Sequence, residues 1–242
     1  MGLPDDESIM HLKHTLAAFV LVPYLAASAV AGPMEDAADA YARGDYTKAL
    51  RLIRPLANDG EAEAQFNLGL MYVTGRGVPQ DYAAAVIWFR KAAEQGYAFA
   101  QSNLGVLYRD GRGVTQDSAD AMIWFRKAAD QGDAIAQYLL GDQYAKGMGV
   151  PQNYAEAMIW FRKAAEQGHR VAKLYLGVMY AEGRGVMQDY VLAHMWFNLS
   201  AEQGEQKAAT ALELAERRMT PGQIVEAQKL ARDWKATKQP SR

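Results

Sequence analysis

The chain has 242 residues, with 26 basic and 28 acidic side chains and no cysteine. No basic cluster stands out, so the electrostatic footprint of a nucleic-acid-binding protein is missing. The lack of cysteine excludes disulfides, thiolate metal sites and a cysteine nucleophile.

Residues 1–31 are predicted to be a secretory signal peptide. Lys13 precedes an apolar run that begins at Leu16 and ends in the small-x-small sequence of residues 29–31. This order of a short basic region, a modest apolar stretch and small residues is typical of such peptides. An uncleaved inner-membrane anchor is the alternative, although the run is shorter than the roughly 20 residues that a spanning helix needs and Pro23 interrupts it. We expect a periplasmic or secreted protein.

In residues 34–60, Tyr41, Gly44, Asp45 and Tyr46 mark the turn between two expected helices, and the loop is shorter than in the units that follow. This pattern resembles a shortened tetratricopeptide-type unit.

From residue 61 onward the chain repeats itself every 36 residues. The clearest marker is a Trp-Phe pair, which occurs at Trp88-Phe89, Trp124-Phe125, Trp160-Phe161 and Trp196-Phe197. A period of 20–50 residues is the signature of a stacked-repeat architecture. Each unit is then expected to contact only its neighbours, without one central core.

The first half of each unit is predicted to be a helix, at residues 61–74 in the first unit. Ala64, Leu68 and Tyr72 share one face at 100° per residue. Gly69 lies in the middle of this helix, where glycine costs about 1 kcal/mol relative to alanine. We therefore expect a neighbouring element to pack closely against it.

The second half, residues 81–95, is also predicted to be helical. Asp81 is a suitable N-cap, and Gly96 can end the helix with a positive φ. The Trp-Phe pair falls on an apolar stripe, which indicates core packing rather than ligand stacking. The intervening Gly75-Arg76-Gly77 is interpreted as a helix-ending turn, because no strand precedes it and no G-K-[ST] follows.

Residues 64–96 spell A-x-x-x-L-G-x-x-Y-x-x-G-x-G-V-x-Q-D-Y-x-x-A-x-x-W-F-x-x-A-A-x-x-G, and this pattern returns three times. It resembles the Sel1-like repeat, a relative of the tetratricopeptide repeat. The resemblance implies an all-α fold, an α-solenoid wound as a right-handed superhelix of helix-turn-helix repeats. The repeats would occupy residues 61–96, 97–132, 133–168 and 169–204. Departures from the pattern include Ser118 for Tyr and Met148 for Arg.

Residues 205–235 are predicted to form the C-terminal capping helices, with a flexible tail at 236–242. The last helix is expected over residues 223–235, with Thr220 as its N-cap and Pro221 at its first position. A solenoid needs such a polar outer face at each end.

Catalytic and metal-binding residues are not expected. His169 and His194 lack the imidazole or carboxylate partner one helical turn away that a metal site would show. No serine lies in a nucleophile-elbow context. We expect a chain that is not an enzyme and needs no cofactor or metal.

Function is expected where the repeats differ from one another. One face of the first helices is more aromatic and aliphatic than an idle solvated face, and in the resembling families this face lines the concave groove where partners bind. An alternative is that some of these residues pack on the neighbouring unit. The predicted contact residues are Phe66, Asn67, Ser102, Asn103, Tyr138, Asp142 and Tyr175, with Arg109 at the rim.

The expected partner is a protein, a peptide or a cell-envelope component, held by an interaction scaffold of the bacterial envelope. One alternative is a β-lactamase-like hydrolase or a binder of β-lactams or peptidoglycan fragments, which some cysteine-rich members of the resembling family suggest. Another is a regulator of envelope signalling or exopolysaccharide export.

Overall fold

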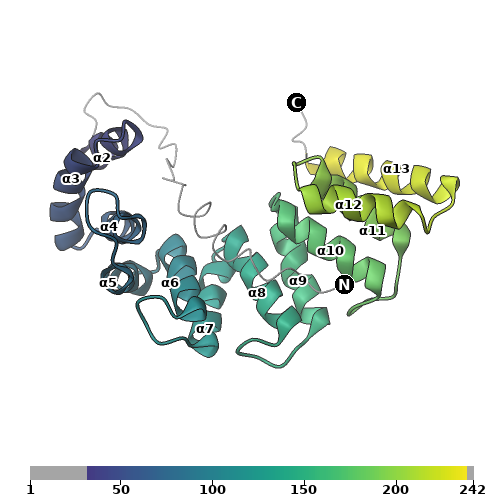
Figure 1. The fold of residues 1–242 in the computed structure, drawn as a ribbon, viewed down its shortest axis with the longest axis horizontal. Helices are drawn as coiled ribbons and strands as arrows, with labels where there is room; N and C mark the ends of the chain where they lie inside the picture. Colours follow the sequence, from purple (N-terminus) through teal and green to yellow (C-terminus); the bar gives the residue numbers. More distant parts are fainter. Residues whose placement is uncertain (1–31, 239–242) are drawn as a thin grey trace. The chain divides into compact units, whose positions relative to one another are not determined.

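The computed structural model describes residues 32–238, and within that range it holds twelve helices and no strand. The predicted all-α repeat fold is confirmed (Figure 1). The predicted signal peptide at 1–31 lies outside the described residues. The described chain divides into two compact units, residues 32–128 and 129–238, and the division falls within α7 (Ser118–Asp130).

The first unit is built from helices that pack in chain order. Contacts join α2 to α3, α3 to α4, α4 to α5 and α5 to α6. Its complete helices are α2 (Pro33–Ala42), α3 (Tyr46–Asn58), α4 (Ala62–Thr74), α5 (Tyr82–Glu94) and α6 (Ala98–Asp110).

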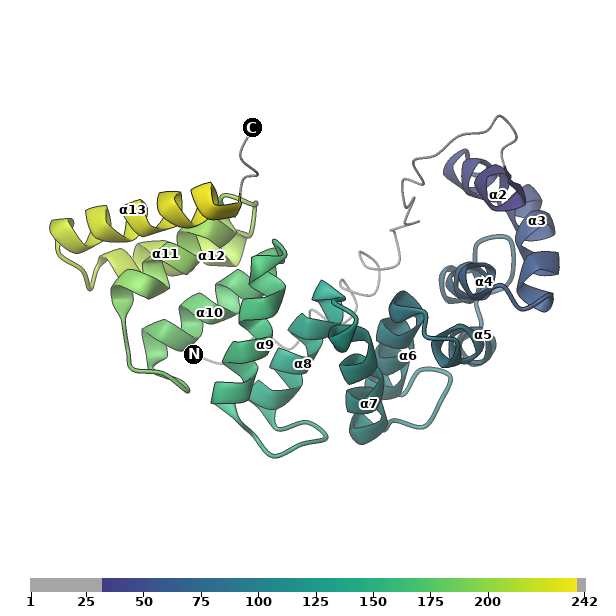
Figure 2. The same cartoon turned by 180° about the vertical axis from the view of Figure 1, so that it is seen from behind.

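The second unit follows the same rule and adds a closing helix (Figure 2). The last helix packs on α11 rather than continuing the alternation, so it covers the end of the array. The helices are α8 (Ala134–Lys146), α9 (Tyr154–Glu166), α10 (Arg170–Glu182), α11 (Tyr190–Ala201), α12 (Gln206–Glu216) and α13 (Pro221–Lys238).

Local sequence signals set the helix ends. The Asp81 and Asn153 side chains accept backbone N–H bonds three residues ahead, as N-caps do. Each first helix of the four repeats ends at a glycine with φ between 65° and 71°, a conformation that residues with a Cβ adopt rarely. Both predictions, the caps and the helix-ending turns, are confirmed.

The Trp-Phe pair and the mid-helix glycine pack against each other. A Cβ added to Gly69 would lie 2.6 Å from the Phe89 ring, and one added to Gly177 would lie 2.4 Å from the Phe197 ring. Both phenylalanines are buried. The phenylalanine of the second helix therefore occupies the space that the glycine, which has no side chain, leaves free on the first helix. This confirms the predicted close approach of a neighbouring element.

The last helix is longer than predicted. It begins at Pro221 and runs to Lys238, so the expected tail at 236–242 is wrong for its first three residues. In the added residues, the Thr237 hydroxyl donates to the Trp234 carbonyl and Lys238 Nζ lies 5.9 Å from the centre of the Trp234 ring, which itself packs 5.6 Å from Trp196 on α11. At the other end, the Thr220 hydroxyl accepts from the Gln223 N–H while the Gln223 side chain accepts from the Thr220 N–H.

Within residues 32–238, none of the helices combines the length and the apolar character needed to span a membrane.

Candidate partner-binding surface

The eight predicted contact residues lie on α4, α6, α8 and α10, the first helices of the repeats, and most are buried. Arg109 retains 11% of its side-chain exposure, and its Nε lies 2.8 Å from Asp110 Oδ1. The seven buried residues are Phe66, Asn67, Ser102, Asn103, Tyr138, Asp142 and Tyr175. Their low exposure agrees with the alternative that such residues pack within the array.

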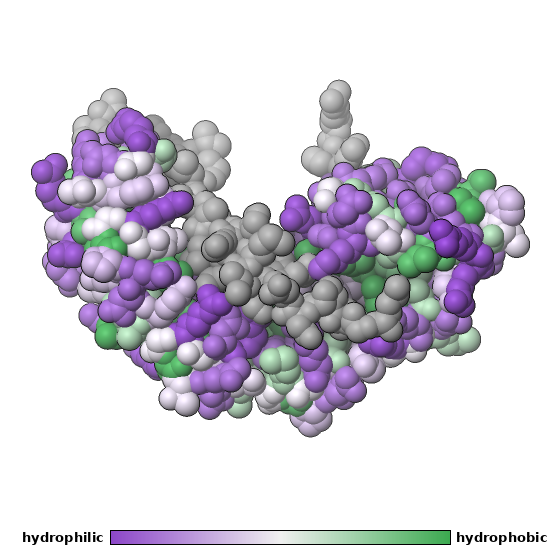
Figure 3. Space-filling model, in the orientation of Figure 1, coloured by the Kyte–Doolittle hydropathy of each residue, from purple (hydrophilic) through white to green (hydrophobic). Residues whose placement is uncertain are grey.

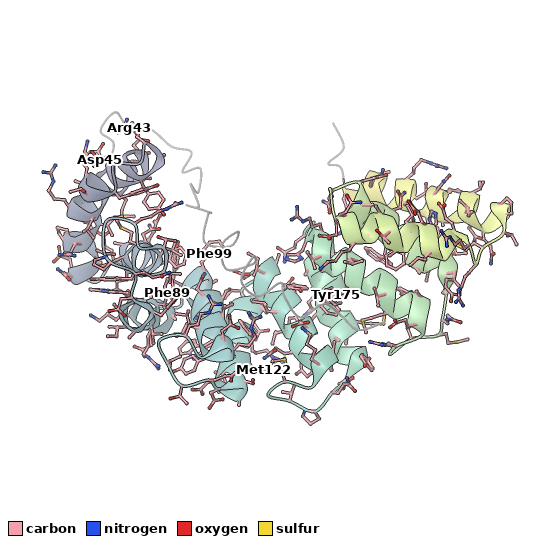
Figure 4. The ribbon with its side chains drawn as sticks, in the orientation of Figure 1. Arg43, Asp45, Phe89, Phe99, Met122 and Tyr175 are labelled. Atoms are coloured by element: carbon pink, nitrogen blue, oxygen red, sulfur yellow. The ribbon has the colours of Figure 1, made fainter. Side chains whose placement is uncertain are left out.

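In the first unit, Phe66 supports two aromatic side chains of the next repeat. Its ring centroid lies 5.2 Å from that of Tyr97 and 6.3 Å from that of Phe99. Tyr97 and Phe99 are themselves 5.8 Å apart and only partly buried. We call Phe66, Tyr97 and Phe99 the aromatic patch; Phe99 is labelled in Figure 4.

The aromatic patch has an acidic neighbour. Burial, followed by the charge of Glu63, raises the pKa of Tyr97 to about 12. The pKa of Glu63 is itself raised, first by burial and then by the nearby Glu61. The negative charge beside the patch therefore lies on the two carboxylates, which favour a cation facing them.

In the second unit, the aromatic side chains of the first helices pack against neighbouring helices. Tyr138 stacks on His169 with centroids 4.7 Å apart, and Tyr175 stacks on Phe161 at 5.2 Å. His169 also caps α10, because its Nδ1 accepts the Ala172 N–H. These contacts join successive helices, so Tyr138 and Tyr175 stabilise the array itself.

The polar members of the predicted set bond to their own helices. Ser102 Oγ donates to the Ala98 carbonyl at 3.1 Å, and Asn103 Nδ2 donates to the Phe99 carbonyl at 2.7 Å. Asp142 accepts from Lys146 one turn later. Bonds of this kind reduce what these side chains can offer to a partner.

Sequence reasoning missed an exposed isoleucine on the second helices. Ile87, Ile123 and Ile159 occupy the same repeat position and are 56%, 53% and 50% exposed. Their common spacing of 36 residues was a visible signal.

The two histidines of the array have structural roles. Buried His194 places Nε2 3.0 Å from Glu216 Oε1, and His169 is the N-cap described above. Among residues 32–238, no three histidine, aspartate or glutamate side chains are grouped as metal ligands would be.

The repeat pattern matches the model of the Sel1 repeat over residues 62–97, 98–133, 134–169 and 171–205, more than half of the chain. The chain belongs to the Sel1 repeat family. No curated protein matches it by sequence. Sel1 repeat proteins generally mediate protein–protein interactions.

Solved structures agree with this assignment. The chain is similar to a Sel1 repeat protein from Oxalobacter formigenes, with 35% identity, a TM-score of 0.68, and coverage of 73% of this chain and 72% of that chain. A protective antigen of uropathogenic Escherichia coli with the same repeat fold shares 34% identity at a TM-score of 0.55, over 86% of this chain and 54% of the antigen. A Klebsiella pneumoniae Sel1 repeat protein gives 26% identity and a TM-score of 0.50, covering 76% of this chain and 91% of that chain.

Proposed function

We propose that this Sel1 repeat protein is a non-enzymatic interaction scaffold and that the aromatic patch is its principal contact in the first unit. The observation that supports this most directly is the partial exposure of Tyr97 and Phe99 on a buried base, Phe66. Aromatic side chains that are already held in place lose little conformational freedom when a partner docks. They are also enriched among the residues that dominate binding energies.

The acidic border indicates the chemistry of the partner. Glu61 and Glu63 flank the patch, and both are exposed. A peptide segment with an apolar anchor and an adjacent lysine or arginine would satisfy both features, because the anchor covers the rings and the cation faces the carboxylates.

The proposal is tested by placing a photo-crosslinking amino acid at Phe99 and, as a matched control, at Ile87. Both positions are apolar and accessible, but Ile87 lies on a second helix. We expect a protein to be captured from position 99 and not from position 87. Tyr97→Ala with Phe99→Ala should then weaken binding of the purified partner about tenfold or more.

Ile87→Ala serves as the affinity control and should leave binding unchanged. Capture of the same protein with equal efficiency from position 87, or full affinity in the patch variant, would contradict the proposal.

We also propose that the scaffold acts in the bacterial cell envelope, as a periplasmic or secreted protein. The support is the basic, apolar and small-residue order of residues 1–31. Fractionation of cells expressing the chain, with the N-terminus of the recovered protein sequenced, tests this. Recovery from the cytoplasm with residues 1–31 intact would contradict it.

A further inference from the structure

One glutamine of the repeat is replaced by a lysine in the fourth repeat. The position holds Gln65, Gln101 and Gln137, and then Lys173. All four side chains are buried. The replacement therefore introduces a charge at a position that the rest of the array keeps neutral.

The glutamines clamp neighbouring helices together. Gln65 Nε2 donates to the Ala57 carbonyl, and Gln65 Oε1 accepts from Gln95 at 2.8 Å. Gln137 makes the equivalent bonds to the Ala129 carbonyl and Gln167. The amide thus uses both its donor and its acceptor within the scaffold, which a lysine, having no acceptor, cannot reproduce.

Lys173 meets the same glutamine position, now Gln203, but as the donor instead of the acceptor. Its side chain is 3% exposed, and Nζ lies 2.9 Å from Gln203 Oε1 and 4.9 Å from the centre of the Trp234 ring. Both partners are neutral. Burial lowers the pKa of Lys173, and the charge of Glu202 opposes this shift. An ammonium group with three donors is costly to keep in such a place unless an anion meets it.

Lys173 borders an open cavity of about 390 Å³ in the second unit. Leu199 and Trp234 supply apolar walls, and Trp234 reaches the cavity because α13 packs on α11. Lys235 and Lys238 add two more cations, of which Lys235 is paired with Glu202 at 2.9 Å. Figure 3 shows the mainly hydrophilic surface over α12 and α13 in this part of the chain.

We infer that this cavity binds the C-terminal residue of a peptide, with the terminal carboxylate on Lys173 and an apolar side chain against Trp234 and Leu199. The volume lies in the range of small-ligand pockets. The lining holds lysines and no arginine, and Glu166 and Glu202 also face it. Three lysines against two glutamates leave one excess positive charge, which a singly charged carboxylate balances and a doubly charged phosphate exceeds. The site uses none of the aromatic-patch residues and stands independently of the function proposed for them.

The test uses the full chain and N-acetyl-Gly-Ala-Leu, with its C-terminal amide as the matched probe. Binding is followed by the NMR shift of the Trp234 indole N–H, assigned with Trp234→Phe. We expect a saturable shift with the free acid and affinity about ten- to hundredfold lower for the amide, because a charged hydrogen bond is lost. A third peptide, N-acetyl-Gly-Glu-Leu-amide, carries only a side-chain carboxylate and should bind as weakly as the plain amide.

Lys173→Gln restores the residue of the other repeats, so this variant should fold, and a thermal melt verifies it. We expect it to lose the acid's advantage over the amide. Lys163→Gln is the control, because Lys163 lies over Trp160 outside the cavity, and it should bind as the parent does. Equal binding of acid and amide, preference for the glutamate peptide, no saturable shift, or full affinity in a folded Lys173→Gln would each overturn the inference.

Discussion

Individual residues of this chain are best judged against their counterparts in the other repeats. Gln143 is an example, because the same position holds Met71, Leu107 and Met179. The Gln143 side chain is fully buried, and neither of its amide atoms has a hydrogen-bond partner. It therefore bears a desolvation cost that its three counterparts avoid.

Gln143→Met is expected to raise the free energy of unfolding by about 1–3 kcal/mol, because it removes unsatisfied polar atoms from the core. Gln101→Met is the control of opposite sign. Gln101 is also buried, but its Nε2 donates to the Ala93 carbonyl at 3.0 Å, so this change should destabilise the chain. Urea denaturation measures both, and loss of stability in Gln143→Met would contradict the account.

Gly105→Ala should lower the unfolding free energy by about 1–3 kcal/mol, although alanine is the better helix former. The added Cβ would lie 2.6 Å from the Phe125 ring. Gly222→Ala in α13 is the matched case, since nothing lies within 4 Å of its Cβ position, and we expect a gain of about 0.4–1 kcal/mol. Thermal melts that rank the two variants the other way would show that the glycine–phenylalanine contact does not limit packing.

Tyr97 gives a prediction in alkaline solution. Its pKa is raised from 10.0 to about 12 in the folded chain, so folding favours the neutral phenol. That contribution is complete below pH 10 and is lost as the pH rises toward 12. Tyr97→Phe should therefore lose less stability than the parent between pH 10 and 12, measured by urea denaturation. Equal losses of stability in the two proteins would contradict a raised pKa for Tyr97.

At the scale of helices, the sequence predicted the elements closely because many boundaries have a local chemical cause, such as the Asp81 cap or the positive-φ glycines. The helix predicted over 61–74 is observed as Ala62–Thr74, with Glu61 at its N-cap. The last helix ends later than predicted, because Thr237 and Lys238 contact Trp234 and the polar composition of this segment does not reveal those contacts.

The candidate site was less predictable than the helices. Helical periodicity identified which residues share a face of the first helices, but not that the next repeat packs on that face. Phe66 is buried by Tyr97 and Phe99, which lie one repeat later. The cavity at Lys173 was missed because Trp234 reaches it only through the packing of α13.

Two departures from the repeat pattern turn out to concern one pair of positions. The loop arginine places its guanidinium over a tyrosine 30 residues earlier, at 5.3 Å for Arg76 over Tyr46 and 5.6 Å for Arg112 over Tyr82. Ser118 and Met148 have that same spacing and depart from the pattern together. Only the structure connects the two positions, because the sequence does not show that the arginine packs over the tyrosine.

Lys173→Gln should stabilise the second unit while abolishing the cavity's preference for a carboxylate. The variant removes a buried ammonium and restores an amide that can bond as Gln137 does, so we expect a gain of about 1 kcal/mol near neutral pH. Burial lowers the folded-state pKa of Lys173, so the parent should recover stability as the pH rises toward the unfolded value of 10.5. The difference in unfolding free energy between the variant and the parent should therefore shrink as the pH rises. A variant less stable than the parent at pH 7 would contradict this prediction.

At the scale of the whole molecule, the two compact units are built from the same repeat but differ in the side chains that they expose. The first has a half-exposed aromatic patch with acidic neighbours, whereas the second uses its aromatics for packing and has a cationic cavity beside its closing helix. Both proposed binding sites lie at positions where the residue changes from one repeat to the next.

The central claim is that the aromatic patch, carried by α4 and α6, meets the partner in the first unit. Hydrogen exchange of the chain with and without the partner captured from position 99 tests it most directly. The account predicts that the partner slows exchange in α4 and α6, around the aromatic patch, and leaves α5 unchanged. Slowed exchange confined to α5, with its exposed Ile87, would contradict it.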